Sequence, residues 1–353
     1  MGVSLPLQSA LKSCNNDDVG PDFSGKVIII GAGAGGLSAG YLLEQRGIDF
    51  EILEASSVYG GRMKINTDFA DFPIPLGAEW LETGTGIFKE IVNDSSLEIK
   101  VETIPDGDDR KFINYTWFNF YDEYIVPAIA NRIIYNRIVQ SINYSGNQVV
   151  VATQKGEYKA DKVIVSVPLK ILQDGDISFL PALPQEKTKA INNMRIWEGF
   201  KAFMEFSSNF YNDGYLFQIT PETDGQKVYY DAAFGQNSSK NILGLFTVGK
   251  PAQDYIIRSG NNLRDFILNE LDGVFSNQAT PNYIKHITQN WNNESFIRAG
   301  YMTDYADWRS VSKLGESVAD KIYFSGGAYT DGNDWVSVHA AAQSARKAVA
   351  EIK

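Results

Sequence analysis

The feature that most constrains the fold is a glycine-rich loop between an apolar segment and a helical segment. Lys26–Ile30 reads KVIII, which is typical of a parallel strand buried on both faces. The loop Gly31–Gly36 follows, and Gly35–Arg46 then has apolar residues at helical spacing until Gly47 ends the helix. Phe50–Leu53 is a second predicted strand. This order predicts the opening βαβ unit of a Rossmann-like α/β domain.

The loop reads GAGAGG and has the G-x-G-x-x-G spacing of dinucleotide-binding proteins. In this spacing the first glycine allows a tight turn, the second lets a pyrophosphate approach, and the third allows close packing of helix on strand. Glu54 ends the second strand, where a carboxylate accepts hydrogen bonds from ribose hydroxyls and disfavours the 2′-phosphate of NADP. The predicted phosphate site consists of Gly31, Gly33, Ala34, Gly35 and Gly36.

The residues after Glu54 resemble the flavin amine oxidase family, which includes monoamine and polyamine oxidases, L-amino acid oxidases and histone demethylases. The resemblance rests on a glutamate-alanine pair, a G-G-R motif and a G-A-x-W segment. It implies a GR2-type, Rossmann-like FAD-binding domain, a strand-rich α+β substrate domain, and FAD as cofactor. The flavin-site residues that it implies here are Glu54, Ala55, Gly60, Gly61, Arg62, Gly77, Ala78, Glu79 and Trp80.

The resemblance continues to the C-terminus. Val139 matches a position whose backbone contacts adenine, and Val167 and Pro168 match the crossover into the substrate domain. Ile322–Ala342 resembles the closing cofactor motif, whose final helix directs its N-terminus at the flavin ring. His339 matches a small-loop His or Glu, or is a plain solvent-facing histidine. The closing motif supplies Gly326, Gly327, Ser337 and Val338 as flavin-site candidates.

Lys201 is the main catalytic candidate. It lies in the apolar predicted strand Trp197–Phe206, where a lysine is costly unless its charge has a partner or the amine is neutral. The resemblance implies that Lys201 reaches flavin N5 through a water, although strand alternation could instead place it at the surface. The family also flanks its flavin with aromatic side chains, for which Tyr301, Tyr305 and Trp335 are candidates, with core packing as the alternative.

The sequence departs from the family pattern in four places. Val58 replaces an arginine that contacts phosphate, and Gly327 replaces a glutamate that binds the ribityl chain. These two losses predict a weaker hold on FAD. The single cysteine, Cys14, lies far from the C-terminal region, so we expect non-covalent FAD. The stretch between Trp80 and Val139 is short, which predicts a trimmed substrate domain with an open or partner-completed channel.

The chain has 353 residues, more than one core usually holds, so we expect two domains. The nucleotide-binding domain is predicted to be discontinuous and to comprise residues 23–80, 122–170 and 292–353. Residues 81–121 and 171–291 would form the substrate domain, and residues 1–22 a flexible leader. Within this plan, Asp122–Arg132 is predicted to be one helix and Ser337–Ile352 the last.

Charge and composition limit the partners. The net charge is -11, which argues against nucleic acid and is compatible with a cationic substrate. Two histidines and one cysteine are too few for most metal sites, so no metal is expected. No segment approaches the roughly 18 apolar residues of a membrane span. The expected partners are those that the family resemblance implies, an amine substrate and dioxygen.

The N-terminal residues allow two interpretations. Within residues 4–18 a moderately apolar stretch ends at Cys14, and a polar, acidic linker follows. This pattern resembles the end of a bacterial lipoprotein signal that lacks its charged start. Lipidation of Cys14 would place the protein in the periplasm on a tether. Alternatively the cysteine occurs by chance in a disordered leader of a cytoplasmic protein.

The sequence predicts an FAD-dependent oxidoreductase that deaminates a primary or secondary amine by hydride transfer to flavin N5, with dioxygen as acceptor and hydrogen peroxide as product. One alternative is a desaturase or C–C dehydrogenase of the carotenoid or protoporphyrinogen type. Another is a flavin-binding subunit with little turnover, which the residues at positions 58 and 327 would explain.

Overall fold

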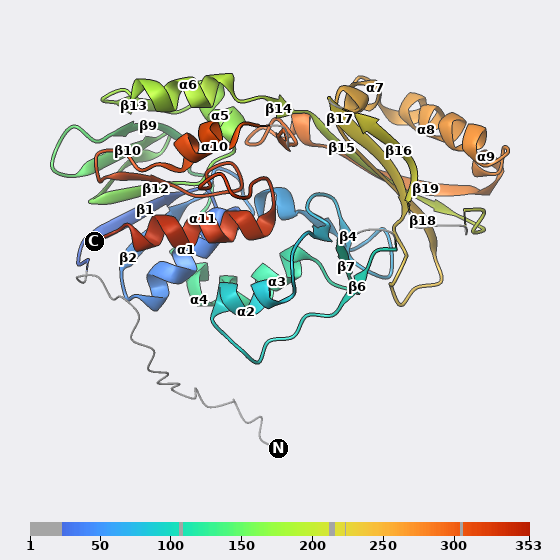
Figure 1. Ribbon diagram of the computed structural model, residues 1–353, viewed down its shortest axis with the longest axis horizontal. Helices are drawn as coiled ribbons and strands as arrows, with labels where there is room; N and C mark the ends of the chain where they lie inside the picture. The colour runs from blue at the N-terminus through green and yellow to red at the C-terminus, as the bar shows by residue number, and fades with distance from the viewer. Residues whose placement is uncertain (1–22, 106–108, 212–215, 223, 304–305) are drawn as a thin grey trace, which may run out of the picture.

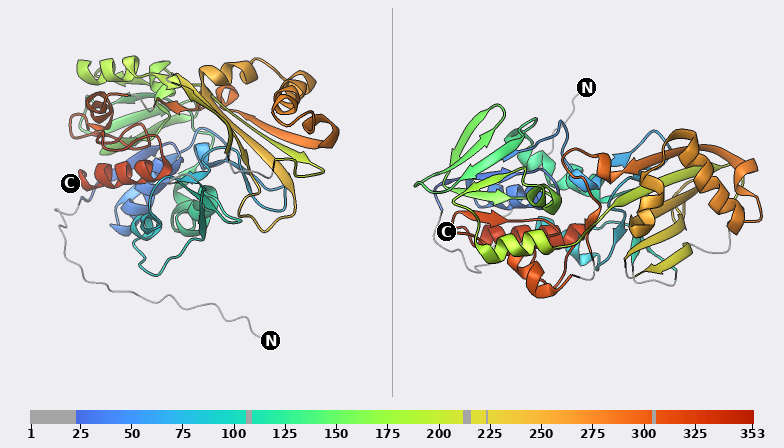
Figure 2. Two further views of the ribbon diagram at one scale, coloured as in Figure 1. Left: turned by 45° about the vertical axis from the view of Figure 1, so that its right-hand side comes forward. Right: turned by 90° about the horizontal axis from the view of Figure 1, so that it is seen from above.

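The protein consists of two lobes that lie side by side in every view (Figures 1 and 2). The computed structural model describes residues 23–105, 109–211, 216–222, 224–303 and 306–353. One lobe is built on a parallel sheet and carries both the first and the last helix. The other is built on an antiparallel sheet from the middle of the chain.

The parallel sheet has five strands in the order β21-β12-β1-β2-β8, and every neighbouring pair is parallel. This is the predicted Rossmann-like arrangement, with β1 at its centre. The strands are β1 (Lys26–Ile30), β2 (Asp49–Leu53), β8 (Ile133–Ile134), β12 (Lys162–Val165) and β21 (Ile322–Phe324).

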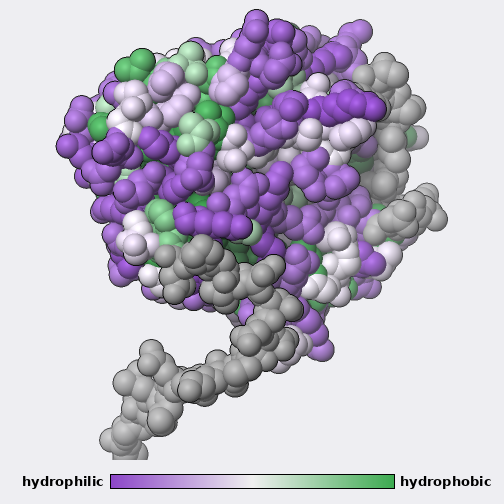
Figure 3. All heavy atoms as spheres, turned by 60° about the vertical axis from the view of Figure 1, so that its left-hand side comes forward, coloured by the Kyte–Doolittle hydropathy of each residue, from purple (hydrophilic) through white to green (hydrophobic). Residues whose placement is uncertain are grey.

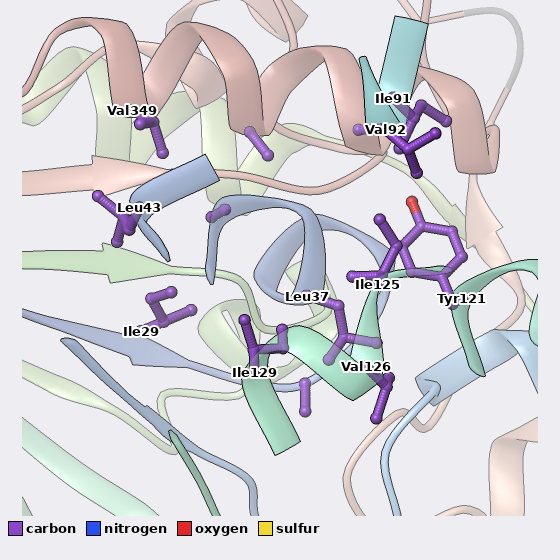
Figure 4. Packing of buried hydrophobic residues seen from close by; sticks show 14 of the residues in the cluster. Ile29, Leu37, Leu43, Ile91, Val92, Tyr121, Ile125, Val126, Ile129 and Val349 are labelled. Atoms are coloured by element: carbon purple, nitrogen blue, oxygen red, sulfur yellow. The ribbon is translucent and has the colours of Figure 1, made fainter. Parts of the chain in front are cut away.

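Both faces of this sheet are covered, which explains why β1 is apolar throughout. Val27 and Ile29 face α1 (Ala34–Gln45) and α11 (Val338–Ala350), as Figure 4 shows for Ile29, Leu37 and Val349. The alternate residues of β1 face the second core. The first core also contains α2 (Gly86–Val92), α3 (Trp117–Tyr124) and α4 (Val126–Ile129).

A four-stranded sheet covers the opposite face in the order β11-β10-β9-β13. Its first three strands form an antiparallel meander, and β13 joins β9 in parallel. These strands are β9 (Val139–Asn143), β10 (Val149–Thr153), β11 (Gly156–Ala160) and β13 (Ser178–Leu180). The same core contains α5 (Leu169–Gln173), α6 (Gln185–Asn193) and α10 (Trp308–Gly315).

The second lobe has an antiparallel sheet in the order β16-β17-β18-β15-β19. Its strands are β15 (Gly199–Phe206), β16 (Leu216–Glu222), β17 (Gly225–Asp231), β18 (Asn241–Gly249) and β19 (Tyr283–Asn290). Helices cover one face, namely α7 (Gln253–Ile256), α8 (Gly260–Val274) and α9 (Ala279–Asn282). Along β15, Phe200 and Ala202 face these helices whereas Lys201 and Phe203 face the other way.

Short strands and single turns complete the structure. They form the sheets β5-β7-β6, β3-β4 and β14-β20. Their bounds are β3 (Ile65–Asn66), β4 (Ile74–Pro75), β5 (Trp80–Leu81), β6 (Val101–Thr103), β7 (Arg110–Phe112), β14 (Ile196–Trp197) and β20 (Tyr301–Met302). The 3-10 turns are η1 (Gly61–Met63), η2 (Ala130–Arg132), η3 (Lys250–Ala252) and η4 (Trp291–Asn293).

The predicted single helix over Asp122–Arg132 is wrong. Helix α3 begins before the predicted start at Asp122. The hydroxyl of Thr116 caps it by accepting from the backbone N–H of Asn119 at 3.2 Å. Pro127 lies in the first turn of α4 and has no backbone N–H to continue α3, so the segment divides into α3, α4 and η2.

The packing also differs from the expected domain division. Helix α2 and the start of α3 belong to residues 81–121 but pack in the first core of the nucleotide-binding lobe. Strand β13 and helix α6 follow residue 170, yet β13 pairs with β9 of the meander and α6 packs against α5 and α10 in the second core of the same lobe. Ala190 and Ile191 of α6 are buried there, so this part of the chain depends on the Rossmann-like lobe.

The surface of the described residues is ordinary. Figure 3 shows hydrophilic side chains over most of one face of the protein, with hydrophobic spots between them. None of the described helices combines the length and the apolar character needed to cross a bilayer. The same part of the chain contains no group of three or more His, Cys, Asp or Glu side chains placed to hold a metal ion.

Candidate functional site

A large cavity lies between the two lobes, and the predicted flavin-site residues meet on its wall. Its volume is about 1360 Å³, which exceeds the roughly 300–1,000 Å³ of most small-molecule pockets. A dinucleotide and a substrate can therefore share it. The predicted cofactor residues that line it are Gly31, Gly33, Ala34, Gly35, Glu54, Ala55, Gly60, Gly61, Arg62, Gly77, Ala78, Glu79, Trp80, Val139, Val167, Pro168, Gly326, Gly327, Ser337 and Val338.

The glycine loop has the geometry that its spacing predicts. Gly31 lies at the turn from β1 toward α1 and has a φ of 101°, a backbone conformation that residues with a side chain adopt only with strain. Gly33 caps α1, and no heavy atom of the described residues lies within 4 Å of the position of a Cβ there. A Cβ on Gly36 would lie 1.9 Å from the carbonyl oxygen of Gly31. Gly33 therefore leaves room for a ligand, whereas Gly36 is a packing residue away from the cavity wall.

Glu54 is held at the end of β2 by backbone donors. Its Oε2 accepts from the N–H of Ala32 at 2.7 Å and its Oε1 from the N–H of Ser56 at 2.8 Å. Each carboxylate oxygen can accept two hydrogen bonds, so acceptor capacity remains for a ribose hydroxyl. The fixed carboxylate thus has the position and the capacity of the predicted ribose ligand.

The two segments that carry the family motifs pack directly on each other. The N–H of Ala78 donates to the carbonyl of Arg62 at 2.9 Å, and a Cβ on Gly77 would lie 1.7 Å from that same oxygen. The Arg62 guanidinium donates to the carbonyl of Gly300 at 2.5 Å. Trp291 donates from Nε1 to the carbonyl of Leu76 at 3.1 Å. Glycine at position 77 is required because the chains approach too closely for any side chain.

A strained turn brings the closing motif to the cavity. Val336 has a φ of 67°, which is rare for a β-branched residue and costs about 1–3 kcal/mol. Its N–H donates to the carbonyl of Gly327 at 2.8 Å. Ser337 then caps α11 by accepting from the N–H of Ala340 at 3.0 Å. The turn places the positive end of the α11 dipole at the cavity wall.

His339 supports this turn from behind the cavity wall. It is 5% exposed, and its Nε2 lies 2.6 Å from Oδ2 of Asp334 and 3.2 Å from the hydroxyl of Ser337. A solvent-facing histidine, one of the two sequence interpretations, is therefore wrong. His339 contacts the residues on both sides of Val336 and helps to hold the turn.

Lys201 lies in a buried cluster at the cavity wall and is 2% exposed, so the surface alternative is wrong. Its Nζ donates to the carbonyls of Pro75 at 2.8 Å and Gly77 at 3.1 Å, and to Oε2 of Glu79 at 2.6 Å. The hydroxyl of Tyr230 donates to the same Oε2. An ammonium has three N–H donors, and these three acceptors match them.

The charges of this cluster oppose the cost of burial. Burial lowers the pKa of Lys201, while Glu79 acts in the opposite direction. Burial alone would raise the pKa of Glu79, but Lys201 and Lys111 outweigh it, so that pKa is lowered. The contact between Lys201 and Glu79 ties β15 to the segment that runs along the cavity. The water-mediated contact between Lys201 and flavin N5 stays a prediction.

The candidate aromatic residues occupy different places. Tyr301 lines the cavity and stacks on Phe246 at 6.5 Å between ring centroids, and Phe246 meets Trp80 edge to face at 5.3 Å. Trp335 lies in the second core of the nucleotide-binding lobe, where its Nε1 donates to the carbonyl of Thr303 at 3.4 Å. The core alternative thus describes the position of Trp335. Tyr305 lies outside the described residues.

The structure shows the surroundings of both departures at the flavin site. Val58 lies at the cavity edge and is 66% exposed, so its side chain adds no charge to the wall. A Cβ on Gly327 would lie 3.2 Å from the carbonyl oxygen of Ser337 and 3.3 Å from Cα of Val336. The strained turn therefore occupies the space into which a glutamate side chain would have to extend.

Several lining residues were missed by the sequence analysis. Arg137 lines the cavity from the strand end before Val139, and its Nε donates to the hydroxyl of Tyr158 at 2.6 Å. Phe246 comes from β18 of the second lobe. Arg137 could have been noticed as a cation two residues before Val139. Phe246 carries no local signal, because only long-range pairing brings it to the cavity.

Comparison with protein families gives two matches. The profile of the flavin-containing amine oxidoreductases matches residues 122–353, and that of an NAD(P)-binding Rossmann-like domain matches residues 29–94. The mouse lysine-specific histone demethylase 1B is 26% identical over 197 residues, which is 54% of this chain and 24% of that protein. The probable polyamine oxidase 4 of Arabidopsis thaliana is 27% identical over 217 residues, 58% of this chain and 42% of that protein. The chain thus matches less than half the length of these relatives.

Solved structures show the same fold. The structure of wild-type putrescine oxidase bound to putrescine matches with a TM-score of 0.74 and covers 94% of this chain and 99% of that chain. The sequence identity is 14%. At this identity the match establishes the two-lobed architecture of the chain.

Proposed function

Because the chain belongs to the flavin-containing amine oxidoreductases and its cofactor is FAD, we propose that it catalyses oxidative deamination of a primary or secondary amine with dioxygen as acceptor. The observation that carries the proposal is the shared cavity. The cofactor motifs line it from one lobe, and Lys201 with an aromatic wall lines it from the other.

The residues on the cavity wall fit FAD. Gly33 leaves room for a pyrophosphate at the N-terminus of α1, where unpaired N–H groups favour phosphate oxygens. Glu54 would hold the ribose, and the backbone from Gly77 to Trp80 would lie along the ring. Ser337 and Val338 at the N-terminus of α11 would stabilise negative charge on the ring.

When bound, FAD supplies the acceptor for a hydride from the amine α-carbon and passes two electrons to dioxygen, which takes up two protons to give hydrogen peroxide. The oxidised amine is an imine, and water hydrolyses it to a carbonyl compound and an amine or ammonia. The contribution of the protein is orientation and electrostatics.

Each group on the second lobe has a definable task. The aromatic wall of Trp80, Phe246 and Tyr301 would orient an amine and keep bulk water from its α-carbon. The Lys201 ammonium would add positive charge beside the cavity, which favours transfer of negative charge toward that wall. The names of the relatives point to aliphatic amines, and we propose a diamine such as putrescine as the first substrate to test.

The proposal is tested on purified protein loaded with FAD. Anaerobic mixing with a panel of amines should bleach the visible flavin band for at least one amine, and admitting air should restore the band and release hydrogen peroxide. Lys201→Met is the matched variant, and it should bleach or recover at least about a hundredfold more slowly while FAD stays bound.

Two results would overturn the proposal. If no amine bleaches the flavin but a large apolar substrate such as a porphyrinogen does, the desaturase alternative is correct. If the protein takes up FAD but no substrate reduces it, while dithionite does, the chain is a flavin-binding subunit without turnover.

A further inference from the structure

A second buried lysine, Lys111, lies behind the Lys201–Glu79 pair. It comes from β7 in the short stretch between Trp80 and Val139, and it is 4% exposed. In the β5–β7 ladder Lys111 pairs with Trp80, directly beside Glu79. The trimmed part of the substrate domain therefore places Lys111 behind the cavity wall, against a residue that lines it.

The two lysines share one carboxylate. The Nζ of Lys111 lies 3.3 Å from Oε1 of Glu79, and the Nζ of Lys201 lies 2.6 Å from Oε2. Tyr230 donates its hydroxyl to Oε2, and Lys111 donates to the carbonyl of Ala232 at 2.7 Å. Lys201 and Tyr230 hydrogen-bond to Oε2, and Lys111 forms an ion pair with Oε1, so rotation of the carboxylate would disturb both ion pairs.

The cluster sets two buried amines against one carboxylate. Burial lowers the pKa of both lysines and Glu79 opposes this shift, so each amine depends on that carboxylate to keep its charge. The next acid that interacts with Lys111 is Asp231, whose pKa is raised by burial although Lys111 lowers it. If position 111 served packing alone, an apolar side chain of similar length would fill it without the free-energy cost of burying a charge.

Lys187 shows what a purely structural buried lysine looks like in this protein. It is also 4% exposed, and its Nζ donates to the carbonyls of Leu314 at 2.7 Å and Glu316 at 2.6 Å at the end of α10. Neither Lys187 nor Lys111 lines the cavity itself. Lys111 differs because it contacts Glu79, a carboxylate that belongs to the cavity wall, whereas the Nζ of Lys187 donates to backbone carbonyls.

We propose that Lys111 is a positioning residue for the reaction: it holds Glu79 from the side opposite Lys201 and so fixes the Lys201 ammonium and the Gly77–Trp80 backbone at the cavity wall. This role rests on the proposed function. Lys111 also adds positive charge behind the wall, which makes the site more favourable for an electron-rich group.

The experiment compares Lys111→Met and Lys111→Arg with Lys187→Met as the matched control. In the FAD-loaded protein, Lys111→Met should lower the midpoint potential of the flavin and slow its reduction by an amine about tenfold or more. Lys111→Arg keeps the charge and should restore the potential. Lys187→Met should lose stability but keep the potential and the rate of the wild type.

A second measurement needs no cofactor. In FAD-free protein, urea unfolding of Lys111→Met, Lys201→Met and the double variant should give non-additive losses, because both lysines act on one carboxylate. If Lys111→Met does not fold, Lys111→Gln, which keeps an N–H donor without the charge, replaces it in both measurements.

The outcomes separate this proposal from the proposed function. A wild-type potential and reduction rate in Lys111→Met, or equal changes in Lys187→Met, would overturn the role of Lys111. Failure of every amine to reduce the wild-type flavin would overturn the proposed function instead, and the potential and the unfolding cycle would still decide the role of Lys111.

Discussion

The contact between Lys201 and Glu79 can be measured as a coupling energy. The perturbation is Lys201→Met, Glu79→Gln and their combination in FAD-free protein. Methionine keeps the length of the lysine side chain without its charge, and glutamine keeps the shape of the glutamate. The wild type and these three variants form a double-mutant cycle that isolates the pair from the effects of each substitution alone.

The size of the effect follows from the geometry. At the 2.6 Å between Nζ and Oε2, the attraction is about 6 kcal/mol at an effective dielectric constant of about 20. Desolvation offsets much of this, and loss of one partner of a buried pair costs about 3–5 kcal/mol. The loss of unfolding free energy in Lys201→Met should lie near the low end of this range, because Glu79 keeps Lys111 as a partner at 3.3 Å. The loss in Glu79→Gln should lie near the high end, because both lysines lose their carboxylate.

The assay is urea unfolding followed by circular dichroism, from which the free energy of unfolding of each variant is obtained. We expect a coupling energy of about 2 kcal/mol for Lys201 and Glu79. The control cycle uses Lys227 and Glu270, whose 2.7 Å ion pair has side chains 18% and 26% exposed. Because water screens that pair, its coupling should be below about 1 kcal/mol.

The buried contact between Lys201 and Glu79 would be refuted if the two cycles gave the same coupling energy, or if the losses from Lys201→Met and Glu79→Gln simply added. Either result would mean that the buried contact does not form in solution. It would also remove the basis for Lys201 as a fixed cation at the cavity wall.

Further predictions concern the glycine loop, the phosphate site, a buried lysine and the leader. Gly33→Ala should leave the unfolding free energy of FAD-free protein within about 1 kcal/mol of wild type and weaken FAD in a fluorescence titration, whereas Gly36→Ala should destabilise the fold because its Cβ would lie 1.9 Å from a carbonyl oxygen. Val58→Arg should tighten FAD in the same titration without changing stability. Burial lowers the pKa of Lys187 to about 7, so between about pH 7 and 10 the unfolded chain binds the extra proton, and stability should rise by up to about 1.4 kcal/mol per pH unit; Lys187→Met should remove that slope in urea unfolding. We propose that Cys14, outside the described residues, is lipidated, and absence of label after growth of producing cells with a radioactive fatty acid would contradict this.

The sequence predicts the fold well where the contacting segments are neighbours in the chain. The β1–α1–β2 unit could be predicted for two reasons. A strand buried on both faces must be apolar, and the close approach of α1 to the carbonyl of Gly31 requires a glycine at position 36. The break between α3 and α4 was missed, although Pro127 marks it, because the apolar residues around it keep helical spacing. Helix propensity alone could not locate it.

The parts of the site that were missed depend on distant segments. The alternation of side chains along β15 allowed Lys201 to point to either face of the sheet. Its direction follows only from the pairing of β15 with β18 and β19 and from the approach of Gly77. Lys111 carried no sequence signal, since its partner Glu79 lies across a strand pair. Trp335 precedes the left-handed Val336, and such a conformation at a β-branched residue cannot be anticipated from local preference.

The neighbouring positions of α1 and α11 have a consequence for how the protein is made. The central sheet needs β21, and its helical face needs α11, yet both follow the whole antiparallel lobe in the chain. During translation β1 and α1 must therefore wait with an uncovered apolar face while that lobe emerges. The nascent protein will need protection at this first strand and helix until β21 and α11 have been made.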